Sequence, residues 1–458
     1  MQVVTIDTPQ LGDRSYLVHD GTVALVIDPQ RDIDRVEAAA RAAQVRITHV
    51  AETHIHNDYV TGGLELSRKL GATYLLNGAD DVAFERRPLA DGDEFTVGAL
   101  HVRVIATPGH THHHLSYLVS GTAGSDPSAQ AVFSGGSLLY GSVGRTDLVT
   151  PQETEQLTRA QYGSVRALAH CAADQAALYP THGFGSFCSS GPATGVAHST
   201  IGEQKRDNHA LNDPDEDHFV ATLVAGLSTY PAYYAHMGPL NRKGADPVDL
   251  TVPEPVGAED LRARIQSGQW VVDLRNRVAF ADRHLRGTVS FEYGDGTSFT
   301  TFLGWTLPWG APITVVGTRA DVGSALRDLA RIGIDGPRVA IGDQPERLVP
   351  DHPLQSYRRV GWAELVAELR SGREVVILDV RRDDEYAQDH IAAAVHIPLH
   401  ELLARLGEVP DGTLWVHCGS GYRAGIAASI LQRAGHDVVH VDALWADAAG
   451  VGVPVVFA

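Results

Sequence analysis

Five residues on three short stretches have the types and spacing of metal ligands. The stretch ETHIHNDYVTGG places His54, His56 and Asp58 at alternate positions just before a glycine pair. His110 follows a second apolar run in TPGHTHHH, and His182 follows a third in YPTHG. Imidazole nitrogens and carboxylate oxygens gathered at strand ends suit zinc or iron. The sequence therefore predicts a metal centre, in which Asp58 binds the metal or activates a water.

A structural remnant that binds no metal is the alternative interpretation of this pattern. A lone histidine in a loop is most often an ordinary core or surface residue. Here, however, each stretch follows a predicted strand, which favours a shared site. The neighbouring run of His112, His113 and His114 is expected to be exposed to solvent or to pack the loop.

Cys418 is the second candidate for chemistry. The stretch VHCGSGYRAG places it after an apolar strand, and Arg423 opens the helix that follows. The four residues between them include two glycines and a serine, so their amide N–H groups can turn inward. Those amides, the helix N-terminus and Arg423 would favour a thiolate at Cys418. A nucleophilic sulfur in such an anion-binding cradle suits attack on sulfane sulfur.

Two rival interpretations of Cys418 stay open. One is a buried structural cysteine, which is the usual fate of a lone free cysteine. The other is a cysteine phosphatase, whose loop has one more residue between cysteine and arginine. Of the remaining cysteines, Cys188 either relays sulfur near the metal or is a partly buried loop thiol, and Cys171 is expected to pack in a helix. Arg145 and Asp147 in GRTD either orient a substrate or pin the loop.

The elements that must position these residues alternate between strands and helices. TVALVIDP (22–29) and RITHVAET (46–53) are typical of buried strands, and residues 32–44 have helical spacing. The predicted active groups lie just after strand ends, as in layered α/β folds. Residues 120–130 are expected to form a loop between two strands.

Length and composition limit the class of protein. The 458 residues predict several domains, and no apolar run approaches the roughly 18 residues that span a bilayer. A formal charge of −19 argues against nucleic acid or an anionic membrane as a partner. No secretory signal is visible, and three well-separated cysteines form no disulfide framework. We therefore expect a cytoplasmic protein.

The second half of the chain contains an internal repeat. VVDLRNRVAFADRHLRGTV (271–289) parallels ILDVRRDDEYAQDHIAAAV (377–395), with Asp273 and Asp379 at equivalent positions. The alternative is two unrelated α/β domains that have similar strand and turn sequences. The first copy has no cysteine, which predicts an inactive module. We expect four segments along the chain: a domain at 1–240, a linker at 241–255, an inactive domain at 256–350 and an active domain at 356–458.

The motifs DVRRDDEY, HIAAAVHIP and CGSGYR resemble those of rhodanese domains. This resemblance implies that Cys418 is the nucleophile that carries a persulfide and that Arg423 organises its loop. It also implies that Asp379 and Arg381, which match the family's early Asp-x-Arg, have a structural role.

The histidine stretches and GRTD resemble the metallo-β-lactamase fold over roughly 1–240. Taken together, the chain is similar to fusions of a persulfide dioxygenase with rhodanese modules. The implied fold class is α/β: an αββα metallo-β-lactamase-like domain followed by two α/β rhodanese-like domains.

The resemblance implies one iron held by two histidines and an aspartate, with zinc as the alternative metal. His54 and His110 match the histidines, but Gly136 stands where the family has its aspartate, and Tyr59 replaces a further histidine. A mononuclear centre on His54, His56 and His110 is the remaining arrangement, and loss of all metal is its alternative. The implied partners are a low-molecular-weight thiol persulfide with sulfite or thiosulfate, and a homodimer is compatible with such fusions.

Three other functions stay open. The chain could be a sulfurtransferase whose N-terminal domain has lost catalysis. It could be a zinc hydrolase that acts on thioesters in the manner of glyoxalase II, although the missing aspartate argues against a dinuclear centre. The rhodanese pair could also serve only as a binding or sulfur-sensing module, which the intact Cys418 loop argues against.

Overall fold

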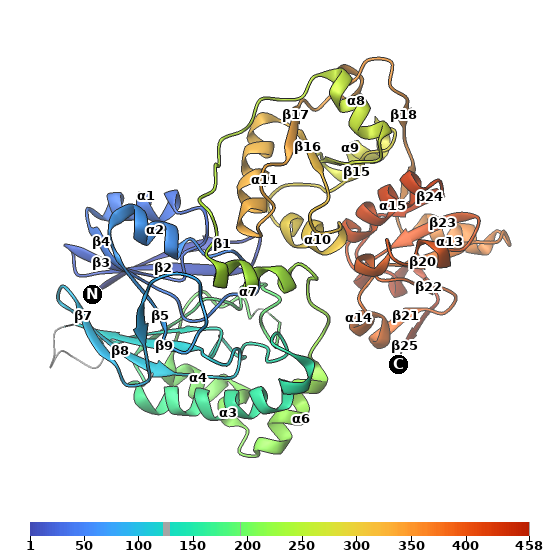
Figure 1. Ribbon diagram of the computed structural model, residues 1–458. Coiled ribbons are helices and arrows are strands. Elements are labelled where there is room, and N and C mark those ends of the chain that lie inside the picture. The colour runs from blue at the N-terminus through green and yellow to red at the C-terminus, as the bar shows by residue number, and fades with distance from the viewer. Residues whose placement is uncertain (122–128, 193, 458) are drawn as a thin grey trace. The chain divides into compact units, whose positions relative to one another are not determined.

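A computed structural model describes residues 1–121, 129–192 and 194–457 (Figure 1). The chain forms two compact units, Met1–Asp249 with Ala330–Gly333, and Leu250–Leu329 with Ile334–Ala458. Most of the loop expected at 120–130 lies outside the described residues. The two repeated stretches, 271–289 and 377–395, both lie in the second unit.

The first unit contains two six-stranded sheets. The first has the order β1-β2-β3-β4-β5-β6, and its strands are β1 (Gln2–Thr8), β2 (Asp13–His19), β3 (Val23–Ile27), β4 (Arg46–Ala51), β5 (Thr73–Asn77) and β6 (Arg87–Leu89). The second has the order β12-β11-β10-β9-β8-β7, and its strands are β7 (Glu94–Val97), β8 (Leu100–Ala106), β9 (Leu115–Ser120), β10 (Ala131–Gly135), β11 (Ala177–Pro180) and β12 (Ser199–Thr200).

The strands of the first sheet are apolar on both faces because both faces are covered. Along β3, Leu25 and Ile27 belong to the core between the sheets, whereas Ala24 and Val26 belong to the core under the helices. Side chains alternate between faces along a strand, so a strand buried on both sides is a continuous apolar run. This explains the sequence TVALVIDP, and the two sheets lie face to face (Figure 1).

Helices cover the outer face of each sheet. Val36 of α1 (Asp34–Ala43) and Leu64 of α2 (Gly63–Leu70) pack on the first sheet. Leu168 of α3 (Thr154–Cys171) and Phe219 of α6 (Glu216–Gly226) pack on the second. The result is the expected αββα arrangement. The other helices of this unit are α4 (Ile201–Asp207), α5 (His209–Asn212) and α7 (Tyr234–Lys243).

The expected linker begins later than the sequence indicated. Helix α7 continues to Lys243, so the first three residues of the 241–255 stretch are helical. Proline-rich composition suggested irregular chain there, but α7 accommodates Pro239 within the helix. The division between the compact units falls after Asp249.

The second unit contains two parallel sheets of related topology. One has the order β15-β13-β16-β17 and the other has the order β19-β24-β23-β20-β22. The strands of the first are β13 (Trp270–Asp273), β15 (Val289–Ser290), β16 (Ile313–Gly317) and β17 (Arg338–Ile341), and those of the second are β19 (Arg358–Val360), β20 (Val376–Asp379), β22 (Val395–His396), β23 (Thr413–His417) and β24 (Asp437–Val441). The order β22-β20-β23-β24 repeats β15-β13-β16-β17, as the sequence repeat predicts. Two small antiparallel pairs add β14 (His284–Leu285) with β18 (Leu354–Gln355) and β21 (Asp389–Ile391) with β25 (Val455–Phe457).

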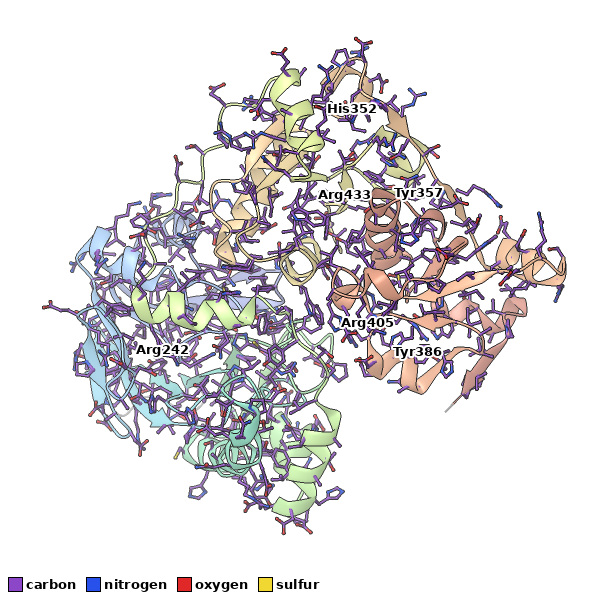
Figure 2. The ribbon with its side chains drawn as sticks, turned by 45° about the vertical axis from the view of Figure 1, so that its right-hand side comes forward. Arg242, His352, Tyr357, Tyr386, Arg405 and Arg433 are labelled. Atoms are coloured by element: carbon purple, nitrogen blue, oxygen red, sulfur yellow. The ribbon has the colours of Figure 1, made fainter. Side chains whose placement is uncertain are left out.

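Helices flank both sheets of the second unit. They are α8 (Ala258–Gln266), α9 (Arg277–Asp282), α10 (Phe299–Thr306), α11 (Arg319–Arg331), α12 (Pro345–Leu348), α13 (Trp362–Arg370), α14 (Asp383–Gln388) and α15 (Tyr422–Ala434). Arg433 on α15 lies 4.2 Å from the ring of Trp270 and donates to the carbonyl of Gly268 at 2.6 Å (Figure 2). These contacts join the last copy of the repeat to the first. No helix among the described residues is long and apolar enough to span a bilayer.

Candidate functional site

The five predicted metal ligands meet at one edge of the two sheets. The strands β4, β8 and β11 end just before the segments that carry them. The ring centroids of His54 and His56 are 4.1 Å apart, and those of His54 and His110 are 4.8 Å apart. His182 lies 5.4 Å from His110 by the same measure, and its Nδ1 is 3.2 Å from Asp58 Oδ2. The structure thus brings together residues separated by 128 positions in the sequence.

Three buried polar atoms of the predicted metal ligands have no hydrogen-bond partner. They are His56 Nδ1, Asp58 Oδ1 and His110 Nε2. Leaving a buried polar atom unpaired costs about 1–3 kcal/mol, so such a cluster needs an explanation. Two overlapping groups of potential ligand atoms lie within 4.8 Å of one another, namely His54, His110 and His182, and His56, Asp58 and His182. This donor set fits a mononuclear metal ion with nitrogen and oxygen ligands.

Neighbouring groups fix the orientation of each imidazole. His110 Nδ1–H donates to the carbonyl of Arg145 at 2.7 Å, which leaves Nε2 as the free nitrogen. His182 Nδ1 contacts Asp13 Oδ1 at 2.8 Å, and His56 Nε2 contacts Asp28 Oδ1 at 3.2 Å. Metal-binding histidines are typically held through their other nitrogen in this way. The same contact explains why Asp28, Glu52 and His56 also cluster: the two carboxylates face the held nitrogen of His56.

The pKa values of the buried histidines are shifted in opposite directions. Burial, together with the positive charge of His182, lowers the pKa of His110 to about 3. Burial likewise holds the pKa of His54 well below its ordinary value. These two imidazoles are neutral and present lone pairs. Burial alone would lower the pKa of His56, but Asp28 outweighs it and raises that pKa to about 9.

Gly136 and Tyr59 shape the surroundings of His110 and His56. A Cβ atom at Gly136 would lie 2.2 Å from His110 Cδ2 and 2.6 Å from its Nε2. The ring of His110 therefore leaves no room for a side chain at this position. Tyr59 is buried, stacks on His56 at 4.3 Å, and places its hydroxyl 3.0 Å from His56 Nε2. Gly136 therefore adds no ligand beside His110, and Tyr59 occupies the space beside His56.

The histidine run divides between surface and core. His112 is exposed and contacts Glu153, and His113 is half-buried and contacts Asp80. His114 is fully buried, stacks on His54 at 4.8 Å, and accepts the amide N–H of Gly136 at 3.0 Å. His114 therefore packs the loop, one of the two expected fates.

Arg145 anchors its own loop, the GRTD stretch at 144–147, to neighbouring segments. It makes a two-point ion pair with Asp147 at 2.7 and 2.8 Å and donates to the carbonyls of Phe187 and Ser228. Its side chain is 2% exposed, so it is not available to a substrate.

The two cysteines of the first unit differ from expectation in opposite ways. Cys188 is fully buried, and burial and the charge of Asp58 hold the pKa of its thiol well above the usual range. Cys171 was expected to pack in a helix, which is wrong, because it ends α3 and is exposed.

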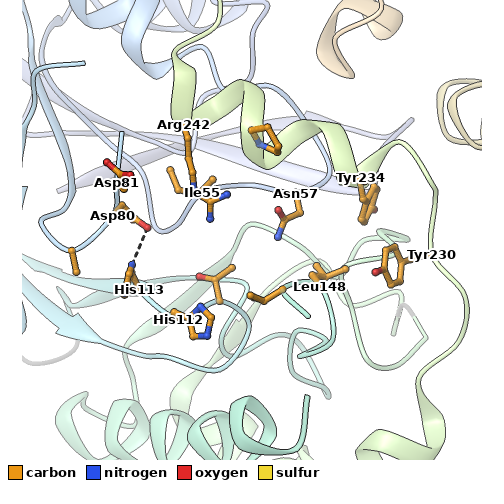
Figure 3. Close-up of a pocket in the computed structure, with 15 residues that line it drawn as sticks. Ile55, Asn57, Asp80, Asp81, His112, His113, Leu148, Tyr230, Tyr234 and Arg242 are labelled. Carbon is orange, nitrogen blue, oxygen red and sulfur yellow. Dashed lines mark hydrogen bonds and ion pairs between the residues drawn. The ribbon is translucent and has the colours of Figure 1, made fainter. Parts of the chain in front are cut away.

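A cavity of about 500 Å³ lies beside the metal-binding loop (Figure 3). Ile55 and Asn57 line it, and they alternate with the predicted ligands along the chain. Tyr230, Tyr234 and Leu148 line one end of the cavity (Figure 3). Asp80, Asp81 and Arg242, together with His113, line the other end.

The second site surrounds Cys418 in the second unit. Cys418 follows β23 and is fully buried, and Sγ accepts the amide N–H of Ala424 at 3.3 Å. The loop carbonyls of Gly419 and Gly421 accept hydrogen bonds from the Trp445 amide at 2.9 Å and from His440 Nε2 at 2.8 Å. These bonds occupy the loop carbonyls, and the start of α15 faces the sulfur.

Arg423 is held in place by Glu385 on α14. Its Nη1 and Nη2 donate to the two carboxylate oxygens at 2.5 and 2.7 Å. Burial alone would raise the pKa of Glu385, but the Arg423 guanidinium outweighs it and lowers that pKa to about 2. The pair fixes the guanidinium beside the loop, and Arg423 interacts electrostatically with Cys418.

Asp379 and Arg381 form a buried structural pair. Arg381 Nε donates to Asp379 Oδ2 at 3.0 Å, and both side chains are essentially inaccessible. In the first copy, Arg275 makes the same contact with Asp273. A pair that occurs in both copies, including the one without cysteine, supports the fold of each.

The sequence analysis missed several residues that shape these sites. Asp13 and Asp28 orient His182 and His56, and Glu385 holds Arg423. Asp28 is one of few non-glycine residues with positive φ, at 52°, which a sequence does not reveal. Glu385 stands in the quoted DDEY motif and could have been suspected from it.

Comparisons with known proteins agree with both halves of this description. The family "Metallo-beta-lactamase superfamily" matches residues 11–182, and "Rhodanese-like domain" matches residues 362–445. The chain therefore has a metallo-β-lactamase fold at its N-terminal end and a rhodanese-like domain at 362–445. The donor set of the first site accords with a metal-binding member of that fold.

Individual relatives cover parts of the chain. It is 37% identical to a hydroxyacylglutathione hydrolase of Brucella anthropi over 139 residues, which is 30% of this chain and 50% of that protein. The chain spans about half the length of the curated relatives it matches. A metallo-β-lactamase structure from Staphylococcus aureus subsp. aureus COL aligns with a TM-score of 0.66 at 26% identity, covering 75% of this chain and 99% of that one. ETHE1 from Myxococcus xanthus aligns with a TM-score of 0.45 at 26% identity, covering 53% and 98%.

Proposed function

We propose that this chain is an enzyme of persulfide-linked sulfur metabolism in which Cys418 carries sulfane sulfur. The observation that supports this most directly is the cradle around Cys418. Sγ accepts a backbone N–H, and Arg423 is fixed nearby by its ion pair with Glu385. Such a cradle stabilises a thiolate and the terminal sulfur of a persulfide. A cysteine with a purely structural role needs no arginine held in this position.

The transfer takes two displacement steps. The Cys418 thiolate attacks the outer sulfur of a thiol persulfide or thiosulfate. The donor S–S bond breaks, and its electron pair leaves with the thiolate or with sulfite. Sulfite then attacks the terminal sulfur of the Cys418 persulfide, which gives thiosulfate and restores the Cys418 thiolate. Each step exchanges one S–S bond for another and needs no external oxidant.

For the first unit we propose oxidation of a low-molecular-weight thiol persulfide, as in persulfide dioxygenase–rhodanese fusions. The overall reaction, RSSH + O₂ + H₂O → RSH + H₂SO₃, supplies the sulfite that the second unit consumes. Iron bound by His54, His110 and the neighbouring ligands would supply oxygen activation. The neutral imidazoles and the unpaired His110 Nε2 support this assignment. A reducing compartment such as the cytoplasm suits three free cysteines.

Two alternative functions each have an observation in their favour. Gly136 and Tyr59 favour a sulfurtransferase whose first unit binds persulfide without oxidising it. Similarity to hydroxyacylglutathione hydrolase favours a zinc-dependent thioester hydrolase. The hydrolase is the weaker alternative, because Gly136 has no side chain that could bridge two metal ions.

The decisive experiment compares sulfur transfer and oxygen uptake in the full chain. Cys418→Ser should abolish transfer from thiosulfate to cyanide, while Cys171→Ser, which removes an exposed thiol, should leave it unchanged. Unchanged transfer in Cys418→Ser would overturn the main proposal. Persulfide-dependent oxygen uptake by iron-supplemented protein supports the dioxygenase, and its absence favours the first alternative. Thioester hydrolysis by zinc-loaded protein would favour the second.

A further inference from the structure

We infer that the cavity beside the metal-binding loop accepts a low-molecular-weight thiol that carries an ammonium group, which Asp80 and Asp81 recognise. This inference rests on the proposed function, because it names the class of thiol that delivers sulfur to the first unit. Sulfur would lie at the Ile55–Asn57 side, next to the metal ligands, and the ammonium would lie at the charged end (Figure 3).

Asp80 is the residue that points to a ligand. Its side chain lines the cavity and is only 8% exposed. Oδ1 contacts His113 Nδ1 at 3.1 Å, but the buried Oδ2 has no hydrogen-bond partner. Burial raises the pKa of Asp80, in keeping with a carboxylate that lacks full solvation. A buried carboxylate oxygen without a donor is costly, and an ammonium group provides three donors.

The charge balance of the cavity favours a cation. Among the described lining residues, Asp80 and Asp81 carry negative charge, and Arg242 carries the single formal positive charge. His112, at the rim, contacts the further carboxylate of Glu153 at 3.1 Å. A cavity lined mainly by one sign of charge attracts ligands of the opposite sign. A thiol with only carboxylates at its far end would find one cation and face several anions.

The size and the other walls suit a small thiol. About 500 Å³ is within the range of small-molecule sites. Tyr230 and Tyr234 stack with ring centroids 5.8 Å apart and provide an aromatic wall for the carbon skeleton. The formally charged side chains are concentrated at the Asp80–Asp81 end, which makes the charge of the thiol the main discriminating feature.

A matched pair of thiols tests the inference by binding alone. Cysteamine and 3-mercaptopropionate have similar length and opposite charge, and 2-mercaptoethanol is a neutral reference. Calorimetry on the full-length protein should show cysteamine binding about fivefold more tightly than 3-mercaptopropionate at low salt. The preference should shrink as ionic strength rises, because exposed Asp81 contributes to it.

Variants that remove one charge each identify the residues that produce the preference for cysteamine over 3-mercaptopropionate. Asp81→Asn and Asp80→Asn should each reduce it, and Arg242→Gln should increase it. Glu94→Gln removes an equal charge from an exposed strand position and should leave it unchanged. Equal binding of the two thiols, a preference for 3-mercaptopropionate, or a preference that persists in both Asn variants would overturn the inference. Because the readout is binding, loss of sulfur transfer with an intact preference would overturn only the proposed function.

Discussion

Arg277, in the copy of the repeat that lacks a cysteine, donates Nε–H to Asp442 Oδ1 at 2.9 Å. Asp442 belongs to the copy that carries Cys418, and its carboxylate lies against Gly421 so closely that a Cβ there would be 2.0 Å from Oδ1. Gly421 has φ +86° and caps α15, directly after the Cys418 loop. The carbonyl of Glu292, also from the first copy, accepts the Tyr422 hydroxyl at 3.1 Å. The cysteine-free copy thus supports the loop of the active copy.

Arg277→Gln should slow sulfur transfer by about tenfold, because it leaves the Asp442 carboxylate with Arg359 as its remaining ion-pair partner and loosens Gly421. The rate of Cys418 alkylation by iodoacetamide, measured well below the unfolding temperature, separates loop positioning from general stability. Arg277→Lys should restore part of the rate, and Arg347→Gln, an exposed arginine of the same copy, should have no effect. A normal rate in Arg277→Gln would show that the first copy does not position the loop.

Glu385→Gln should destabilise the second unit by about 1–3 kcal/mol at pH 7, because it breaks a largely buried ion pair. The pKa of Glu385 is lowered from 4.5 to about 2, so its contribution is present above pH 4.5 and is lost as pH falls toward 2. Urea unfolding of wild type and variant should therefore differ at pH 7 and converge toward pH 2.5. Glu374→Gln, at an exposed position, is the control. If the stability difference between wild type and Glu385→Gln does not change with pH, the Glu385 carboxylate is not its source.

Much of the fold followed from local patterns in the sequence. The apolar runs of β3 and β4 and the repeated Asp-x-Arg motif indicated the layers and the duplication. The metal ligands were found because His54, His56 and Asp58 lie within one stretch. Asp13 was missed because it lies on β2 of the first sheet, whereas His182 follows β11 of the second, so only the packing of the two sheets brings them together. Asp28 was missed because its contact with His56 depends on how the segments after β3 and β4 turn. The contact of Arg277 with Asp442 depends on packing between the two copies, which no local pattern reveals.

His110→Ala should reduce bound metal from about one ion per chain to a small fraction, because His110 Nε2 is buried and free to bind. Elemental analysis of protein purified without a histidine tag measures this directly. His112→Gln, two residues away on the same loop but exposed, should retain the metal. Equal metal content in His110→Ala and wild type would place the metal elsewhere.

Gly136→Asp, which restores the family's aspartate, should not restore that family's metal site. The new Cβ would lie 2.2 Å from His110 Cδ2, and the glycine amide already donates to His114 Nε2. Relieving the clash requires His110 to move away from the other ligands, and we expect a loss of about 1–3 kcal/mol in the free energy of unfolding. Gly163→Asp, at a helical position with open space around its Cβ, controls for the added charge. Thermal unfolding and metal analysis check both effects. Unchanged stability together with higher iron content in Gly136→Asp would contradict this prediction, because it would show that His110 can move aside for an aspartate that binds metal.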